Sequence, residues 1–353
     1  LGIVQQTDFL TQMAEIGVIL LMFSAGLETD LKELLKTGPI ALLIACAGVF
    51  VPLVGGTLLY MAFYGYDGIG TEHFYKALFI GTIMTATSVS ITVQSLREMG
   101  KLKGKVGTTI LSAAIIDDVI GIIVLTFVIG FKNPDSNPGD VILSTILFFI
   151  LAVGVGFISY KVFKWVDKKY PHTRRIPIAG LAYCFAFAYI AEHYFGIADI
   201  TGAYVAGIIL CSIKDSEYIA EKMDINSYML FGPVFFASIG LKTNITGITG
   251  EILLFSLGFV LVALITKIIG CSLMAKVCRF SWGDSIKIGV GMMTRGEVAL
   301  IVAQKGLAVG LMTDVYFTAV IFLIIISSIS TPIILKLLYA RNKEPEGMVE
   351  CKN

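Results

Sequence analysis

Charged side chains are scarce in this sequence. Only 15% of its 353 residues are charged, whereas an average soluble domain carries about 25%. The net charge is +1 and there is no basic arm, so a nucleic acid is not an expected partner. With 56% hydrophobic residues and a mean hydropathy of +0.84, the composition predicts a protein that lies in membrane lipid.

Several short motifs are also missing. The six cysteines are scattered and form no C-x-x-C, so the sequence suggests neither a zinc site nor a disulfide framework. No strand followed by G-x-G-x-x-G occurs in the tail, so we expect neither a nucleotide-binding domain nor a cofactor. The sequence has no signal peptide and begins with Leu1, so we expect the natural N-terminus to lie further upstream.

Long apolar runs fill most of the chain and predict about eleven transmembrane helices. Helices are expected because the runs lack the alternation of a barrel and lipid offers backbone groups no partner. The predicted spans are 9–27, 39–64, 74–96, 106–131, 141–163, 177–195, 198–213, 227–241, 251–275, 285–308 and 314–338. We therefore expect a single all-α membrane domain over residues 1–339 and a short tail at 340–353.

Basic residues are distributed unequally between the two sets of connections. One set contains 21 of the 27 Lys and Arg residues and consists of 28–38, 97–105, 161–176, 212–226, 276–287 and the tail from 336. Cytoplasmic connections carry the excess of Lys and Arg, so this set and the C-terminus are predicted to be cytoplasmic. The start of this chain is then predicted to lie outside.

Two adjacent carboxylates occupy the middle of the fourth span. Asp117 and Asp118 lie about twelve residues, or roughly 18 Å of helix, from each end of the span. A charge at this depth costs about 2.5–3.5 kcal/mol on insertion scales, which makes both residues functional candidates. Neighbours on a helix point about 100° apart, so we expect one to face a hydrated cavity and the other a neighbouring helix.

Three further charges lie within apolar spans. Lys267 is about 13 Å of helix from the cytoplasmic Lys276, too far to reach water, and therefore needs a buried anionic partner such as an aspartate. Arg295 and Glu297 are structural or gating candidates that either neutralise each other or cap the ends of half-helices. No special role is expected for Glu15, Glu192 and His193, which lie near the outer ends of their spans.

Two spans look discontinuous. The third is rich in Ser and Thr, which compete for backbone hydrogen bonds, and the tenth contains three glycines near Arg295. A shift of about 209 residues aligns Met84-Thr85 with Met293-Thr294, within spans that are predicted to run in opposite directions. This pattern predicts inverted repeats whose two broken helices cross at the binding site of a transporter.

Five segments resemble one known family throughout the chain. They are AEIGVILLMFSAGLE (14–28), TATSVSITV (85–93), IIDDVIG (115–121), TK-x-x-G (266–270) and RGEVAL (295–300). The sequence is similar in these segments to the monovalent cation:proton antiporter-2 family, and above all to its NapA-like and GerN-like sodium/proton antiporters. Relatives of the NapA branch have thirteen helices, and this chain resembles them from their third helix onward.

The resemblance implies roles for individual residues. Asp118 would bind the transported cation and the proton, while Asp117 would pair with Lys267. Hydroxyls and carbonyls of the broken helix, including Thr87 and Ser88, would line the site. No resident metal is implied, since the alkali cation at Asp118 and Asp117 is cargo.

The resemblance also implies how the helices are organised. It implies a mobile core of helices from about 39–131 and 251–338, dimerisation helices from about 9–27 and 177–241, and a linker helix at 141–163. Such a protein would work as a homodimer in the cell membrane, in contact with lipid, by an elevator-like movement.

The function expected from these observations is electrogenic exchange of Na⁺ or Li⁺ for H⁺ by competition at Asp118. Oxygen ligands suit hard alkali ions, and removal from water disfavours the ionised form of a carboxyl group. K⁺/H⁺ exchange is the main alternative. Remote alternatives are a cation channel and an intramembrane aspartyl protease, although adjacent aspartates on one helix diverge, whereas a protease needs them to converge.

Overall fold

Most of the described residues are helical. The computed structural model describes residues 7–29, 38–102, 104–131, 138–170, 173–242 and 250–341, and no strand occurs among them. The helices are α1 (Asp8–Leu27), α3 (Gly38–Tyr64), α4 (Glu72–Ile83), α5 (Val89–Glu98), α6 (Lys105–Phe131), α7 (Pro138–Lys169), α8 (Arg175–Phe195), α9 (Asp199–Leu210), α10 (Ser216–Asn226), the π-helical η1 (Ser227–Phe231), α11 (Gly232–Lys242), α12 (Gly250–Val277), α13 (Trp282–Gly291), α14 (Glu297–Ala308) and α15 (Asp314–Arg341).

Each of the eleven predicted apolar spans is mostly helical, and the third and the tenth are each interrupted by five residues. Seven of the described helices, α1, α3, α6, α7, α8, α12 and α15, are long and apolar enough to cross a membrane. The predicted all-helical membrane fold is therefore confirmed, while the number of crossings and their orientation stay predictions. The connection at 212–226 holds the additional helix α10, which forms because Ile219 and Met223 supply it with a buried apolar side. From residue 342 the predicted tail lies outside the described residues.

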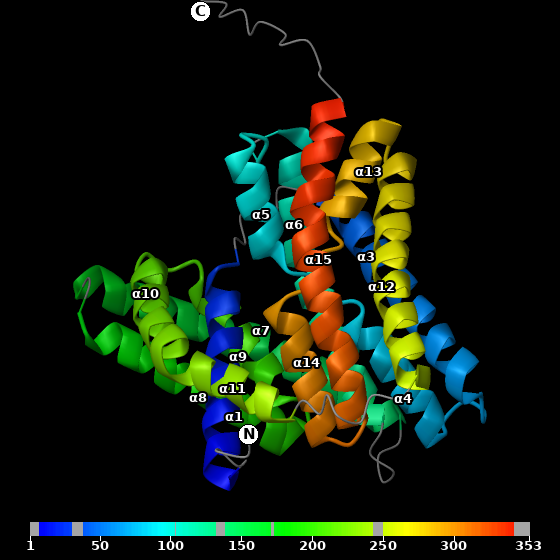
Figure 1. The fold of residues 1–353 in the computed structure, drawn as a ribbon. Helices are drawn as coiled ribbons and strands as arrows, with labels where there is room; N and C mark the ends of the chain where they lie inside the picture. Colours follow the sequence, from blue (N-terminus) through cyan, green and yellow to red (C-terminus); the bar gives the residue numbers. More distant parts are fainter. Residues whose placement is uncertain are drawn as a thin grey trace, which may run out of the picture.

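The helices pack in two groups, which Figure 1 shows side by side. In one group α3 packs against α4, α6 and α12, and α12 also packs against α13 and α15. In the other group α9 packs against α1 and α8, and α1 also packs against α11. The long helix α7 contacts α6 on one side and α8 and α9 on the other. The roles of core, linker and dimerisation helices stay predictions.

Close backbone contact holds α1 against α9. A side chain added at Gly26 would overlap the backbone of Tyr204 and Gly207, and one added at Gly207 would overlap Gly26. Small residues at both positions therefore allow the two helices to approach within backbone contact, as is typical of helices that associate in lipid.

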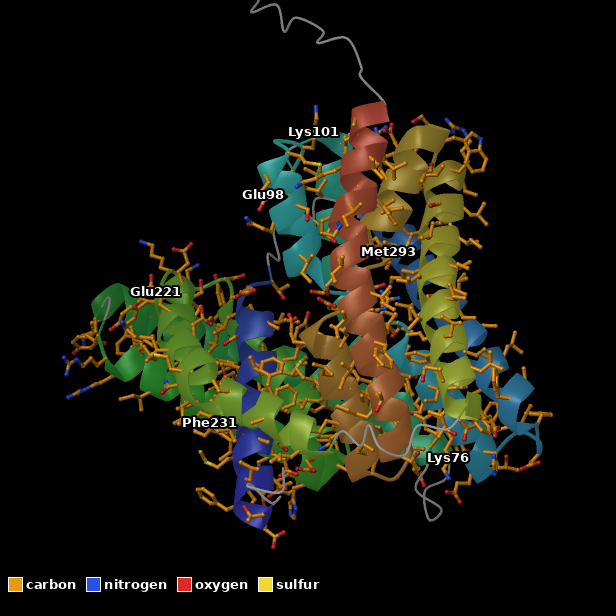
Figure 2. The ribbon with its side chains drawn as sticks, in the orientation of Figure 1. Lys76, Glu98, Lys101, Glu221, Phe231 and Met293 are labelled. Carbon is orange, nitrogen blue, oxygen red and sulfur yellow. The ribbon has the colours of Figure 1, made fainter. Side chains whose placement is uncertain are left out.

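Two helix pairs are interrupted in the middle of the fold. Residues 84–88 separate α4 from α5, and residues 292–296 separate α13 from α14. The first interruption is rich in hydroxyls, and the Thr85 side chain donates to the Thr82 carbonyl 2.8 Å away, in competition with helical bonding. Figure 2 labels Met293 in the second interruption, between Lys101 towards one end of the molecule and Lys76 towards the other.

The two interruptions cross and bind each other. The Ser88 backbone N–H donates to the Thr294 carbonyl over 2.8 Å. The Thr92 hydroxyl donates to the Gly291 carbonyl over 2.8 Å and lies 3.0 Å from the Thr294 hydroxyl. Backbone groups released by the interruptions thus find partners inside the protein, which is the condition for irregular backbone at membrane depth. The predicted pair of crossed discontinuous helices is present.

Candidate functional site

A buried ion pair lies beside the crossing point. The Lys267 ammonium of α12 is 2.7 Å from Oδ1 of Asp117 on α6, and the two side chains are 0% and 1% exposed. Lys267 also donates to the Thr85 carbonyl over 2.9 Å, and the Thr87 hydroxyl donates to Oδ2 of Asp117 over 2.7 Å. Both oxygens of Asp117 therefore have a donor, and its charge has an opposite charge in contact.

A glycine on α3 leaves room for this pair. A Cβ atom at Gly48 would lie 2.8 Å from the Cys271 sulfur, 3.2 Å from Oδ1 of Asp117 and 3.4 Å from Cε of Lys267. A side chain at this position would press on the ion pair itself. The close contact of α3 with α6 and α12 therefore depends on glycine at position 48.

Asp118 faces in a different direction from its neighbour. It lines a cavity of about 410 Å³, and its Oδ1 atom is buried without a hydrogen-bond partner among the described residues. The cavity is lined by Ala25, Glu28, Thr29, Thr87, Val93, Leu102, Leu111, Ile115, Asp118, Glu297 and Val298. Three of these side chains are carboxylates and none of them is basic. The arrangement attracts cations and leaves one buried carboxylate oxygen free to bind one.

The cavity is reached from the side of the basic connections. Glu28 and Thr29 follow the last residue of α1, and Leu102 lies in the connection between α5 and α6. A second hollow of about 560 Å³, lined by residues that include Lys214 and Glu217, shares Glu28 and Thr29 with the first. Both connections belong to the set that the sequence predicts to be cytoplasmic. In this structure Asp118 thus faces the predicted cytoplasmic side.

The predicted hydroxyl residues Thr87 and Ser88 are both buried but differ in position. Thr87 lines the cavity and at the same time binds Asp117. The Ser88 hydroxyl packs against Gly296, where a Cβ atom would lie 2.6 Å from it, and is buried without a partner among the described residues. Ser88 contributes to the crossing through its backbone and is not part of the cavity lining.

Arg295 is bound by backbone carbonyls. Its Nη2 atom donates to the Met84 carbonyl, at the C-terminal end of α4, over 2.6 Å. Its Nη1 atom lies 3.3 Å from the carbonyls of Met292 and Met293, at the C-terminal end of α13. One guanidinium thus caps two helix ends whose dipoles are negative. Among the ion pairs of the described residues none joins Arg295 to Glu297, so of the two roles expected from the sequence the structure has the capping one.

Glu297 begins α14 and is exposed on the cavity surface. Glu28, which the sequence analysis did not single out, is exposed at the same cavity. The only feature of the sequence that could have pointed to Glu28 is that it is the acidic last residue of the 14–28 segment. The cavity therefore contains two carboxylates in addition to that of Asp118.

The fold and the charges in it are those of a membrane transporter. The model of the family described as "Sodium/hydrogen exchanger, transmembrane" matches residues 1–341, and the chain belongs to that family. It is a multi-pass transmembrane protein and a transporter, which excludes the intramembrane protease and any other enzyme.

Named relatives are similar over most of their length. The Na(+)/H(+)-K(+) antiporter GerN of Bacillus cereus is 39% identical over 338 residues, which are 95% of this chain and 85% of that protein. The probable Na(+)/H(+) antiporter GerT of the same organism is 41% identical over 340 residues, 95% of this chain and 88% of that protein. The resemblance to cation:proton antiporters drawn from the five sequence segments is confirmed.

A solved structure has a similar fold. The sodium proton antiporter MjNhaP1 from Methanocaldococcus jannaschii at pH 8 superimposes with a TM-score of 0.68, covering 93% of this chain and 83% of that one. The sequences are 16% identical, so this likeness concerns the fold alone.

Proposed function

We propose that this protein exchanges Na⁺ for H⁺ across the cell membrane and that both ions compete for the carboxylate of Asp118. The observation that carries the proposal is the difference between the two adjacent aspartates. Asp117 has a charge partner and two donors, whereas Asp118 has a free buried oxygen in an acidic cavity. The names of GerN and GerT, which include Na⁺/H⁺ exchange, support the choice of ions.

Competition for one carboxylate is sufficient for coupling. When ionised, Asp118 carries a negative charge that Lys267 does not neutralise, and it attracts a partly dehydrated alkali cation. When protonated, it is neutral, and removal from water favours this form. A proton and a cation cannot both neutralise the single charge of Asp118. The site therefore carries either the proton or the cation across the membrane, and never both at once.

The neighbouring groups define what else holds the cation. Carboxylate, hydroxyl and carbonyl oxygens suit hard cations, and the cavity surface offers the hydroxyl of Thr87 next to Asp118. Glu28 and Glu297 line the same cavity, and their negative charges raise the local concentration of cations there. Lys267 is bound to Asp117, so it does not displace a cation from Asp118.

The test is reconstitution into liposomes that contain a pH-sensitive dye, with Na⁺, Li⁺ and K⁺ added in turn. The wild type should move protons in response to Na⁺, and Asp118→Asn should fall to the rate of protein-free liposomes. Glu98→Gln is the matched control, because this carboxylate is exposed on α5 and is bound by Gln94. Its rate should equal that of the wild type.

A second readout separates loss of the site from loss of the fold. Ligand that binds the folded state raises thermal stability, so Na⁺ should stabilise the wild type and Glu98→Gln but not Asp118→Asn. Exchange that survives Asp118→Asn would remove this residue from its role. A response to K⁺ alone would replace Na⁺ by K⁺ as the substrate, and an ion current without a counter-movement of protons would indicate a channel.

A further inference from the structure

An ion pair links the two helix groups on the side away from the cavity. Its lysine is on α14, which packs against α15 and α4 of the first group, and its carboxylates are on α8 and α9 of the second. Lys305 on α14 lies 2.7 Å from Oδ1 of Asp199, the first residue of α9, and 3.7 Å from Glu192 on α8. Lys305 and Asp199 are 19% and 14% exposed, so the contact is mostly shielded from solvent. Glu15 on α1 adds a third carboxylate to the surroundings of Lys305.

The pair lies on the side opposite to the open cavity. Along α14, Lys305 comes about eight residues after Glu297, which lines the cavity, and this is about 12 Å of helix. Along α1, Glu15 is separated from the cavity residue Glu28 by most of the helix. The pair therefore lies on the other side of Asp118, away from the side on which the cavity opens.

A second contact lies beside the first. The Thr126 hydroxyl of α6 is 3.2 Å from that of Thr201 on α9, and both residues are buried. Thr126 follows Asp118 by about two turns on the same helix. The first turn of α9 thus contacts both α6 and α14 on this side.

We propose that Lys305, Asp199 and Glu192 form a gate that closes the outer route to Asp118 and opens once in every exchange cycle. This inference rests on the proposed Na⁺/H⁺ exchange, in which Asp118 must be reached from each side of the membrane in turn. In the closed state Lys305 occupies the carboxylates as a tethered cation. In the open state the withdrawal of α14 leaves Asp199 and Glu192 free to attract the incoming cation at the mouth of the outer route.

Labelling of a buried cysteine measures the gate without any transport. Thr201→Cys is placed in a background in which the six native cysteines are replaced by serine, and it is labelled from outside with a membrane-impermeant methanethiosulfonate reagent. Lys305→Gln should increase the labelling rate about fivefold, the shift in the closed-to-open equilibrium that loss of one partly shielded ion pair gives. Asp199→Asn should have the same effect from the other partner.

The matched control is an ion pair within one helix. Lys76 and Glu72 are 2.8 Å apart on the same helix, α4, so their ion pair does not connect the two helix groups. Lys76→Gln should therefore leave the labelling rate unchanged. The charge exchange Lys305→Asp with Asp199→Lys should restore slow labelling. An unchanged labelling rate in Lys305→Gln, or an equal increase in Lys76→Gln, would overturn the proposal that these residues form a gate.

Cross-linking tests whether the gate must open for exchange. Lys305→Cys with Asp199→Cys in the same background should lose Na⁺-driven proton movement when a bifunctional methanethiosulfonate reagent bridges the two thiols, and regain it on reduction. A bifunctional reagent is needed because Lys305 and Asp199 meet at the ends of their side chains, which does not place two cysteine sulfurs at disulfide distance. Undiminished exchange by the cross-linked protein would make the pair a static contact and would overturn the proposal. Faster labelling in Lys305→Gln together with no response to Na⁺ would keep the gate and reject Na⁺ as the substrate.

Discussion

The ammonium group of Lys267 and the carboxylate of Asp117 lie 2.7 Å apart in a position that solvent does not reach. Such a pair carries no net charge as long as both members are present. Loss of one member leaves a buried charge without compensation, which costs about 3–5 kcal/mol, whereas loss of both leaves none. The charge of Asp117 is thus balanced within the protein as long as Lys267 keeps its proton.

The first prediction concerns the stability that this pair confers. Lys267→Gln and Asp117→Asn should each lower the free energy of unfolding by about 3–5 kcal/mol, because each leaves one uncompensated buried charge. The double variant should lose much less than the sum of the two. Unfolding of the purified protein in detergent, by heat or by increasing SDS, measures the three differences.

Additive losses in this cycle would contradict the assignment of the pair. Two residues in contact give a coupling of about 0.5–3 kcal/mol or more, while independent residues give none. The cycle is independent of transport, so it remains informative if a variant no longer exchanges ions.

The second prediction concerns the guanidinium that joins the two interrupted helices. Arg295→Lys keeps the charge, but an ammonium group lacks the planar fork that reaches both helix ends at once. The variant should lose about 1–3 kcal/mol of unfolding free energy, since carbonyls at one end lose their donor. Unfolding in detergent measures the loss, and Na⁺-driven exchange should slow in parallel.

Arg174→Lys serves as the control for this substitution. Arg174 is exposed next to the first residue of α8, so its replacement should leave the unfolding free energy within about 0.5 kcal/mol of the wild type. An Arg295→Lys variant as stable as Arg174→Lys would show that one helix end at a time is sufficient.

The sequence predicts the buried charges better than it predicts their partners. Asp117, Asp118 and Lys267 stand out because apolar spans contain few charges, and each needs a reason to be there. Which aspartate meets Lys267 depends on the rotation of α6 about its axis, which no local pattern encodes. The resemblance to antiporters implied Asp117, and the contact in the structure is with Asp117.

Contacts with backbone and contacts between distant segments leave even weaker signals. The carbonyl acceptors of Arg295 have no side-chain identity, so the sequence could not decide between capping and pairing with Glu297. Lys305 and Asp199 meet only because α9 and α14 are brought together by the packing of the two helix groups. Glu28 likewise lines the cavity only because the fold brings the end of α1 next to α6 and α14.

The third prediction concerns pH and the carboxylate at the cavity entrance. Although its side chain is exposed to the cavity, the surrounding protein removes part of the water around the Glu28 carboxyl and raises its pKa above the ordinary value, and the nearby carboxylates of Asp224 and Glu297 raise it further. Glu28 therefore keeps its proton to a higher pH and attracts cations only above that pH. Glu28→Gln should raise the apparent KM for Na⁺ about twofold to threefold at alkaline pH and leave it unchanged at acidic pH.

The measurement is Na⁺-driven exchange at several pH values and at low ionic strength, where exposed charges are least screened. Glu98→Gln again provides the control, since its carboxylate is exposed outside the cavity lining. An effect of Glu28→Gln that is largest at acidic pH would reverse the sign of the argument and exclude Glu28 as an entrance charge.

The fourth prediction is that exchange is electrogenic. Asp117, Asp118 and Lys267 are three ionisable groups at one site, so a cycle has room for more protons than cations. Movement of one net charge gains about 2.3 kcal/mol per 100 mV, equivalent to a shift of about fiftyfold in the exchange equilibrium. Na⁺ uptake into proteoliposomes, with the membrane potential set by K⁺ and valinomycin, should therefore change with voltage in the wild type and in Glu98→Gln. Uptake that is indifferent to voltage would mean that protons and cations move in equal number, and that Asp118 alone carries the exchanged charge.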